Sequence, residues 1–498
     1  MASDIEPQFG KWRQRLWPIH RFELKKFIPL LLLKFLISFN YVLLYNTKDT
    51  LVVTGEHSGA EVISILKGWF VLPCAFLVLL VYTKLSNRLS MQKMVYTFLA
   101  PFLIFFFIFG FILFPNKEFF TPHLLCDKLF SFVGQGHTHW IAPIFNWMNS
   151  LYYVVAELWG QVVIMLLFWT YANNITRMKE AKRYYTLFTA AGDFGPMLGG
   201  ALVAWIASMQ TRGDFVSTVQ HVSTLAIIVG FLVIGVFWWM GRYVMTDPRC
   251  VPEEEREEKK KKPKLSLSKS FKYILSSKYL LCLAAMVIGY GLAMNLVEIA
   301  FKAHLKQLYP VANDYQNFGG KLMFYTGLIP FLVAFFAGGN ILRVFGWTRT
   351  AMITPIVVGG CGVLFLLVSM SIGRLEGVAT LLGVTPLVMV VGIGAFQSVM
   401  GKTMKYSLFD PTKEMAFIPL DPEAKIKGKA AIDVVGSRLG KSGSSWLQAG
   451  LLDTIAGGSI LSVTWFLAPV VTIVVFGWLM AIRTISPEFS KVAEESNG

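Results

Sequence analysis

Runs of twenty or more mostly apolar residues recur along the whole chain, each long enough to cross a hydrocarbon core about 30 Å thick. Twelve of these runs are predicted to be membrane-crossing helices, which gives an all-α polytopic fold. Their ranges are 27–53, 62–83, 95–115, 140–172, 185–208, 222–241, 279–301, 322–342, 351–371, 379–400, 442–458 and 461–482. The eleventh run is rich in Gly and Ser and shows the pattern least clearly. The first and fourth are longer than a crossing requires, so we expect them to tilt or to continue beyond the bilayer.

The overall composition supports a membrane protein. Of the 498 residues, 55% are hydrophobic and 15% are charged, whereas soluble domains carry about 25% charged residues. A soluble enzyme, a secreted disulfide scaffold and a disordered protein are therefore excluded. The five cysteines are scattered and form no CxxC pair, so neither a disulfide framework nor a thiolate metal site is indicated.

The net charge of +16 follows the expected topology. If the N-terminus is cytoplasmic and the crossings alternate, 36 of the 46 Lys and Arg residues fall in inner segments and 7 in outer loops. This positive-inside distribution predicts an even number of crossings with both termini in the cytoplasm. It accounts for most of the net charge, so no nucleic-acid partner is expected.

The largest break in composition is the charged stretch Asp247–Ser270, which contains EEEREEKKKKPK and no apolar periodicity. It separates six predicted crossings from six more, an arrangement typical of major-facilitator-like transporters. No signal peptide is recognised; the first residues form a basic arm with an amphipathic stretch at Trp12, Leu16 and Trp17. The predicted organisation is an arm at 1–26, six-helix halves at 27–246 and 279–482, a cytoplasmic linker at 247–278 and a tail at 483–498.

Ionisable residues inside crossings are the strongest functional signal, since each costs about 2.5 to 3.5 kcal/mol at the bilayer centre. Lys48 lies near the end of the first crossing, Glu157 interrupts the fourth and Glu298 interrupts the seventh, and Lys402 and Lys405 follow the tenth. The first, fourth, seventh and tenth helices are equivalent positions of the repeated unit and line the central cavity in this architecture. We therefore predict a polar cavity crossed by ion pairs that break and reform.

Simpler interpretations remain open for each of these charges. Lys48 could snorkel to the interface beside Asp49, and Glu157 could make a structural hydrogen bond between helices. Glu298 could pair with Lys302 four residues later on the same helix. Lys402 and Lys405 could be ordinary positive charges of an inner loop. Lys34 and Lys67, near segment ends, are interpreted as snorkelling residues.

Aromatic and amide residues share helix faces with these charges. Tyr41 and Tyr45 precede Lys48, Tyr153 and Gln161 flank Glu157, and Asn295 precedes Glu298. This mixture suits a ligand with a flat π-system and a charged end, although aromatic residues at helical spacing more often serve packing.

The segment Gly436–Ser445 has the sequence GSRLGKSGSS and is similar to a phosphate-binding loop. The spacing fails, because Val435 stands where the motif G-x-x-x-x-G-K-[ST] requires its first glycine. ATP hydrolysis is therefore not expected. Arg438 and Lys441 near a glycine-rich helix start still form a candidate anion site; the alternative is a flexible hinge.

His123, His137 and His139 are interpreted as residues of one outer loop, without the spacing of a helical metal site. The sequence shows no Ser/His/Asp set and no paired catalytic carboxylates. We therefore predict no metal, no cofactor and no enzyme activity.

The stretches YNTKDTLVVT, AELWG, NLVE, GRYVMTDPR and KYSLFDPTKEMAFIPLDPEAKIKGKAAIDVV closely resemble the ATP/ADP translocases of plastids and obligate intracellular bacteria. The resemblance covers essentially the whole chain and is strongest to chlamydial members. The family's important charged positions match Lys48, Glu157, Glu298 and, in LGKSG, Lys441. After LGKSG the family is glycine-rich, whereas this chain has Ser444, Ser445 and Trp446.

This resemblance implies exchange of ATP for ADP across the inner membrane of a bacterium, with ATP and ADP as substrates and phosphate as a further candidate. Phosphates are predicted to contact Lys48, Lys441, Lys405 and Arg438, with Glu157 and Glu298 as gating ion-pair partners. Tyr41, Tyr45 and Asn295 are candidates for adenine contacts. No protein partner is inferred beyond the lipid bilayer. The alternatives are proton-coupled transport of nucleoside triphosphates, transport of NAD and, more remotely, a membrane-embedded nucleotide enzyme.

Overall fold

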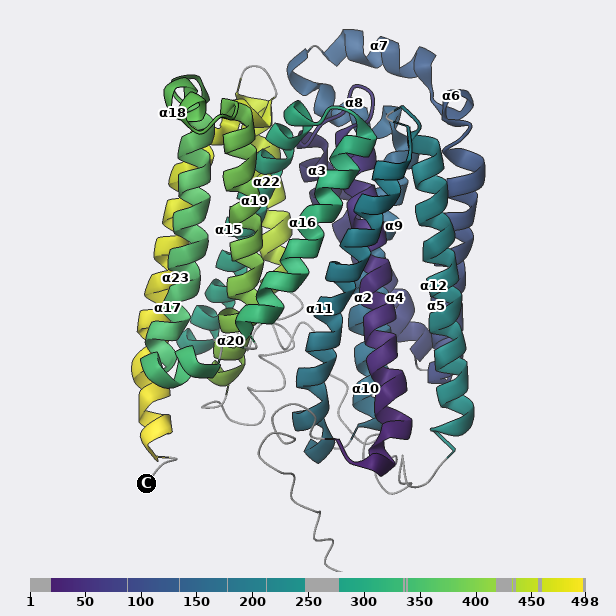
Figure 1. Ribbon diagram of the computed structural model, residues 1–498, viewed down its shortest axis with the longest axis vertical. Coiled ribbons are helices and arrows are strands. Elements are labelled where there is room, and N and C mark those ends of the chain that lie inside the picture. Colours follow the sequence, from purple (N-terminus) through teal and green to yellow (C-terminus); the bar gives the residue numbers. More distant parts are fainter. Residues whose placement is uncertain are drawn as a thin grey trace, which may run out of the picture.

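The computed structural model describes residues 19–86, 88–133, 135–176, 178–211, 213–246, 277–334, 336, 339–417, 432, 436–455 and 459–495. Within these ranges it is a bundle of long helices without a β-strand (Figure 1). Most of the predicted arm, with its amphipathic stretch, and nearly all of the predicted linker lie outside the described residues.

Short helices cap one end of the bundle, and the C-terminus lies at the other (Figure 1). These ends are called the α7 face and the C-terminal face below. The capping helices are α6 (Lys117–Phe120), α7 (His123–Val133), α8 (Thr138–Phe145) and α18 (Glu376–Leu381).

Six long helical segments build the first half, after a 3-10 turn η1 (Arg21–Glu23). They comprise α2 (Leu24–Val53); α3 (Glu61–Ile65), η2 (Leu66–Val71) and α4 (Leu72–Ser86); α5 (Met91–Ile108) and η3 (Phe109–Leu113); α9 (Trp147–Trp159), η5 (Gly160–Phe168) and α10 (Trp169–Ile175); α11 (Met178–Met209); and α12 (Phe215–Tyr243). Each overlaps a predicted crossing. The η2, η3 and η5 pieces are π-helical turns, which are rare and often occur at functional sites.

The second half repeats this plan with six further long segments. They comprise α15 (Lys278–Leu308); α16 (Ala312–Val333); α17 (Gly339–Met370); α19 (Pro386–Met404), continued by η8 (Lys405–Phe409) and α20 (Asp410–Ala416); α22 (Ser437–Thr454); and α23 (Ile460–Glu495). The helix α23 runs on through most of the predicted C-terminal tail. The twelve predicted crossings therefore all correspond to long helical segments in the described part of the chain.

Two boundaries differ from the prediction. The apolar stretch 140–172 is not one helix, because Asn146 leaves the helical conformation at φ −96° and ψ 43° and separates α8 from α9. The helix α17 is kinked at Gly346, whose φ of 70° is a conformation that favours glycine.

Within the described residues, nine of the long segments are apolar and long enough to cross a membrane by length and composition. The other three, α11, α16 and α22, carry more small and polar residues and pack where the halves meet. The contact between α11 and α16 is the most extensive between any two helices. A Cβ atom on Gly200 of α11 would lie 2.6 Å from the carbonyl oxygen of Gly320 in α16. Glycine lets the two backbones approach closely, as is common between membrane helices.

An aromatic cluster in the first half fixes the orientation of α9. Trp159 is fully buried and meets the ring of Phe102 edge-on, with centroids 5.4 Å apart. About two turns earlier, Tyr152 packs against Phe109, with ring centroids 4.5 Å apart. These contacts hold α9 against α5 and η3, while Glu157 reaches Lys48 of α2. Packing of the apolar face therefore positions the charged residue of this helix.

Candidate functional site

The first ion pairs of the site lie between α2 and α9. The Lys48 ammonium group is fully buried and lies 3.1 Å from Oε1 of Glu157 and 2.7 Å from Oδ1 of Asp49. Lys48 therefore does not snorkel. Lys48 contacts Asp49, its neighbour in the sequence, and it also contacts Glu157, as the prediction of a cavity crossed by ion pairs requires.

A second lysine connects this group to the other half. Lys302 Nζ, on α15, lies 2.8 Å from Oδ2 of Asp49 and 2.7 Å from Oε1 of Glu298. The i,i+4 pair on α15 therefore forms, but Lys302 also joins the two halves. Glu298 in turn lies 3.4 Å from Lys67 Nζ, which returns to the first half.

These contacts form one continuous chain, which we call the ion chain: Glu157, Lys48, Asp49, Lys302, Glu298 and Lys67. Positive and negative groups alternate along it, so three ammonium groups balance three carboxylates. It crosses between the halves twice, at Asp49–Lys302 and at Glu298–Lys67. An isolated buried charge would be very unfavourable, and the alternation gives every charge in the chain a partner.

Aromatic rings enclose the centre of the ion chain. The Lys48 ammonium group lies 4.0 Å from the ring centroids of both Tyr45 and Tyr153. The Tyr45 hydroxyl donates a hydrogen bond to Oε1 of Glu298 at 2.7 Å. Tyr41 packs against Tyr45, with centroids 5.6 Å apart, and a Cβ atom on Gly160 would lie 2.8 Å from the Tyr41 ring. The predicted adenine residues Tyr41 and Tyr45 are thus beside the ion chain.

Asn295 links the ion chain to α22. Its Oδ1 accepts a hydrogen bond of 2.6 Å from Lys67 Nζ, and its Nδ2 donates to the Ser444 hydroxyl at 2.5 Å and to the backbone carbonyl of Lys441 at 3.3 Å. The backbone of α22 is therefore held directly against the site. Ser444 and Ser445 continue the helix, and their hydroxyls donate hydrogen bonds to the Lys441 carbonyl within it.

Three further cations have no carboxylate within 4 Å among the described residues: Lys402, Lys441 and Arg438. The only described polar contact of Lys402 Nζ is the sulfur of Met323, a weak acceptor, at 3.6 Å. Lys441 is exposed and lies within electrostatic range of Glu157. Arg438 donates a hydrogen bond of 2.8 Å to Gln161 of the other half. These groups supply positive charge that the ion chain does not neutralise.

Lys405 is placed differently from these three cations. Its ammonium group pairs with Asp410 at 2.7 Å and lies 4.6 Å from the ring centroid of Tyr406. Of the four cations predicted to contact phosphate, Lys48 and Lys405 therefore have carboxylate partners, and Lys441 and Arg438 have none in the described part of the chain.

Sequence reasoning missed Lys67, and its interpretation as a snorkelling residue is wrong. Its side chain is 10% exposed and contacts Glu298 and Asn295 of the other half. One signal was available, because Lys67 is followed by Gly68. A Cβ atom on Gly68 would lie 2.8 Å from the ring of Trp446 in α22, so the glycine makes room for this side chain. A lysine next to a required glycine indicates a helix contact, not a lipid-facing surface.

The glycine-rich segment near the C-terminus also has a packing role. It forms the first turns of α22, and a Cβ atom on Gly440 would lie 2.9 Å from the carbonyl oxygen of Ile288 in α15. Gly440 thus lets α22 approach α15 closely, which brings Arg438 and Lys441 near the site.

The three histidines are not in a loop as predicted. His123 begins α7, His137 ends a 3-10 turn and His139 is buried in α8. His137 and His139 contact Oδ1 of Asp453 in α22 at 3.3 and 3.0 Å, and Trp140 donates to the same oxygen at 2.9 Å. One carboxylate thereby connects the two halves at the α7 face.

Other side chains also connect the halves, beside the ion chain and nearer the α7 face. Gln316 donates to Thr47 at 2.9 Å, and Asn46 donates to the Gln316 backbone at 2.9 Å. Thr218 donates to Asn313 at 2.7 Å. Toward the C-terminal face, Arg438 to Gln161 is the single described hydrogen bond between the halves. The halves are therefore joined most firmly at the α7 face.

Two pseudo-equivalent helical halves, a central ion chain and contacts concentrated at one face define a transporter of the major-facilitator-like class. The fold agrees with a solved nucleoside transporter, with a TM-score of 0.57 at 11% identity, covering 92% of this chain and 99% of that one. Over residues 2–489 the chain matches the model of the TLC ATP/ADP transporter family, and it belongs to that family.

Named relatives agree with this assignment. The chain is 43% identical over 495 residues to ADP,ATP carrier protein 1 of Chlamydia trachomatis, covering 98% of this chain and 93% of the relative. It is 38% identical over 477 residues to the chloroplastic ADP,ATP carrier protein 1 of Arabidopsis thaliana, covering 95% and 75%. The family resemblance drawn from the sequence motifs is therefore confirmed.

Proposed function

We propose that this protein exchanges ATP for ADP by alternating access, with the ion chain as the element that couples nucleotide binding to movement of the two halves. The observation that carries the proposal is a charge-balanced ion chain lying beside cations that have no described carboxylate partner. A polyanionic triphosphate matches those cations, which bind phosphate through charge-assisted hydrogen bonds.

The phosphate chain of the nucleotide would be held by Lys441, Arg438 and Lys402. Lys48 and Lys405, also predicted to contact phosphate, would first have to leave Glu157 and Asp410. Arginine suits two phosphate oxygens at once, whereas lysine acts as a point charge. The adenine ring would lie against Tyr41 or Tyr45 near Asn295, where flat aromatic surface adjoins amide groups.

Exchange follows if the empty carrier is held by its own ion pairs. A ligand shifts a conformational equilibrium only as far as it binds one state better than the other. Bound phosphates would compete with Glu157 for Lys48 and with Glu298 for Lys302 and Lys67. Competition for Lys302 and Lys67 would weaken the two links between the halves. The empty carrier keeps all its ion pairs and reorients slowly, so uptake would depend on a nucleotide leaving in the opposite direction.

The orientation in the membrane is part of the same proposal. The distribution of Lys and Arg supports an orientation with both termini in the cytoplasm of a bacterial cell and the α7 face outside. With the halves joined at the α7 face, the described conformation would be closed toward the outside, and the site would be reached from the cytoplasm.

Uptake of labelled ATP into proteoliposomes tests the proposal directly. Vesicles are preloaded in turn with ADP, ATP, phosphate or buffer alone. Exchange requires rapid uptake into vesicles that hold ADP or ATP and little uptake into those that hold buffer. Uptake into buffer-loaded vesicles that is driven by a pH step would contradict exchange and support proton-coupled transport. Release of phosphate from ATP would instead support an enzyme.

A further inference from the structure

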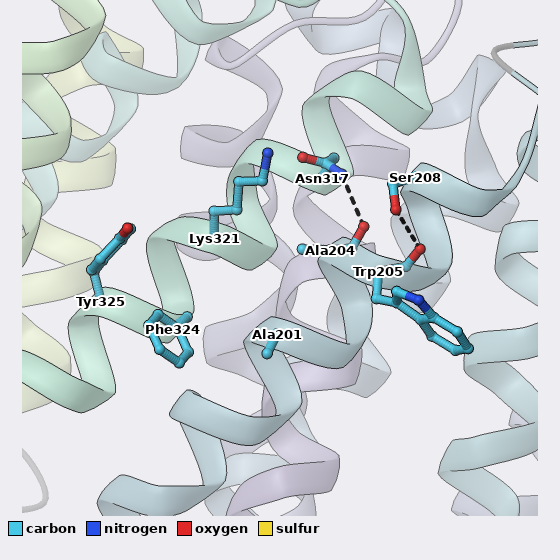
Figure 2. A pocket seen from close by; sticks show the side chains of 8 residues that line it. All are labelled: Ala201, Ala204, Trp205, Ser208, Asn317, Lys321, Phe324 and Tyr325. Atoms are coloured by element: carbon cyan, nitrogen blue, oxygen red, sulfur yellow. Dashed lines mark hydrogen bonds between the residues drawn. The ribbon is translucent and has the colours of Figure 1, made fainter.

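A shallow groove lies between α11 of the first half and α16 of the second, and its described lining contains no member of the ion chain. Its volume is about 440 Å³, and its lining includes Ala201, Ala204, Trp205, Lys321 and Phe324 (Figure 2). The groove therefore runs along the seam where the halves meet.

Small residues at the helix crossing form the floor of the groove. Where the helices cross, Gly200 and Gly320 bring backbone against backbone, and a Cβ atom on Gly320 would lie 2.6 Å from the amide nitrogen of Ala204. Ala201 and Ala204 extend only a methyl group beside this crossing. Trp205 and Tyr325, each more than half exposed, add aromatic surface to the lining.

The polar residues of the lining gather at one end. In Figure 2, Lys321, Asn317 and Ser208 lie above Phe324 and Ala201. Asn317 donates to the Ala204 carbonyl at 2.9 Å, and Ser208 donates to the Trp205 carbonyl at 2.7 Å, so both side chains have partners. Lys321 is exposed and has no described hydrogen bond or ion pair. A lysine on a membrane helix is costly without an anionic or aqueous partner.

We propose that this groove binds an anionic phospholipid of the surrounding membrane. The headgroup phosphate would contact Lys321, and an acyl chain would lie along Ala201 and Phe324. The lining matches such a lipid in two respects: a cation stands at one end and apolar surface continues from it. Aromatic residues such as Trp205 and Tyr325 are typical of the boundary between headgroups and hydrocarbon.

The position of the groove gives the lipid an influence on transport. One wall belongs to each half, so the groove has this shape only while α11 and α16 are packed as described. A lipid that binds this arrangement would favour the conformation joined at the α7 face. This inference adds a ligand outside the nucleotide site and does not depend on which nucleotide is carried.

Native mass spectrometry of the full-length protein, exchanged into palmitoyl-oleoyl phosphatidylglycerol or phosphatidylcholine, tests the site. Lys321→Gln removes the proposed phosphate contact, and Ala201→Phe fills the groove without changing charge. Lys128→Gln is the matched control, because Lys128 is an exposed lysine of α7 outside the groove. We expect the wild type and the control to retain phosphatidylglycerol preferentially, and both groove variants to retain about fivefold less.

The result that overturns the proposal is equal retention of phosphatidylglycerol by wild type and Lys321→Gln, or the same loss in Lys128→Gln. Nucleotide exchange by the same preparations separates this outcome from failure of the transport proposal. If the wild type exchanges nucleotides but Lys321→Gln retains as much phosphatidylglycerol as the wild type, only the lipid site is rejected. If lipid retention requires Lys321 but the wild type does not exchange nucleotides, only the transport proposal is rejected. Exchange by Ala201→Phe also shows that this variant is folded.

Discussion

Lys302 Nζ and Asp49 Oδ2 lie 2.8 Å apart, although the two residues belong to opposite halves of the bundle and both are buried. This ion pair is the middle link of the ion chain. Because Lys302 also holds Glu298 and Asp49 also holds Lys48, breaking the link between the halves leaves each charge with another partner. Such a link can open without leaving a buried charge unpaired, which suits a contact that must form and break in every transport cycle.

Replacing Asp49 tests this link. Asp49→Asn removes one of the two carboxylate partners of both Lys48 and Lys302, so it should destabilise the conformation joined at the α7 face. We expect the rate of ATP/ADP exchange in proteoliposomes to fall at least about tenfold. The double variant with Lys302→Gln should lose much less than the two single losses combined, because both remove the same contact. Glu376→Gln, at an exposed position of α18, serves as the control, and additive losses would contradict the link.

Glu157 tests whether ion pairs prevent the empty carrier from reorienting. Glu157→Gln keeps the size of the side chain but frees Lys48 from one carboxylate. We expect nucleotide binding to persist, while exchange slows or labelled ATP enters vesicles that contain only buffer. Binding is measured by isothermal titration calorimetry and coupling by uptake with and without internal ADP. Exchange kinetics like those of the wild type, with full coupling, would remove Glu157 from the gating mechanism.

The sequence predicted the helices and the positions of Glu157 and Glu298, because both follow from the free-energy cost of placing polar groups in the bilayer. An apolar run long enough to cross the bilayer must become a helix, and a carboxylate within such a run, as at Glu157 or Glu298, needs a partner. The spacing on one helix also offered the pair of Glu298 with Lys302. The pairs between the halves were not predicted, because Lys67 resembles an end-of-helix lysine and only tertiary packing brings it to Glu298 and Lys302 to Asp49.

The same reasoning explains the wrong boundary of the fourth crossing. Most residues from Ile141 to Phe145 and along α9 are apolar, so the pattern indicates a single long helix. The break at Asn146 is stabilised by tertiary contacts, since its side chain donates to the Glu56 carbonyl at 2.7 Å. A contact 90 residues away in the chain leaves no local signal.

Lys402 and Lys405 are close in sequence but are predicted to behave differently. Lys402 has only a thioether sulfur as a polar contact among the described residues, whereas Lys405 has Asp410. We expect Lys402→Gln to raise the KM for ATP by about tenfold, consistent with loss of one charge-assisted hydrogen bond. Lys405→Gln should change it less. Transport kinetics of both variants decide the matter, and a larger effect at Lys405 would favour the sequence-based choice of that residue as the phosphate contact.

The contact of His139 with Asp453 predicts a pH dependence at the α7 face. Burial lowers the pKa of His139, and the attraction of Asp453 offsets only part of that effect. In the joined conformation the imidazole therefore binds a proton less readily than a solvated histidine, whose pKa is about 6.5. Protons consequently favour the separated conformation. The joined conformation is therefore most stable above pH 6.5, the ordinary pKa of histidine, and loses stability as the pH falls below it.

Spin labels on exposed positions of the two halves, Leu124 in α7 and Gly377 in α18, report this change by double electron–electron resonance. We expect the distance distribution to shift toward longer separations between pH 7.5 and pH 5.5. His139→Gln should abolish most of the shift, because glutamine can still donate to Asp453 but cannot be protonated in this range. His57→Gln is the matched control, since His57 is an exposed histidine that does not contact Asp453. A pH response unchanged in His139→Gln would assign the titration to another group.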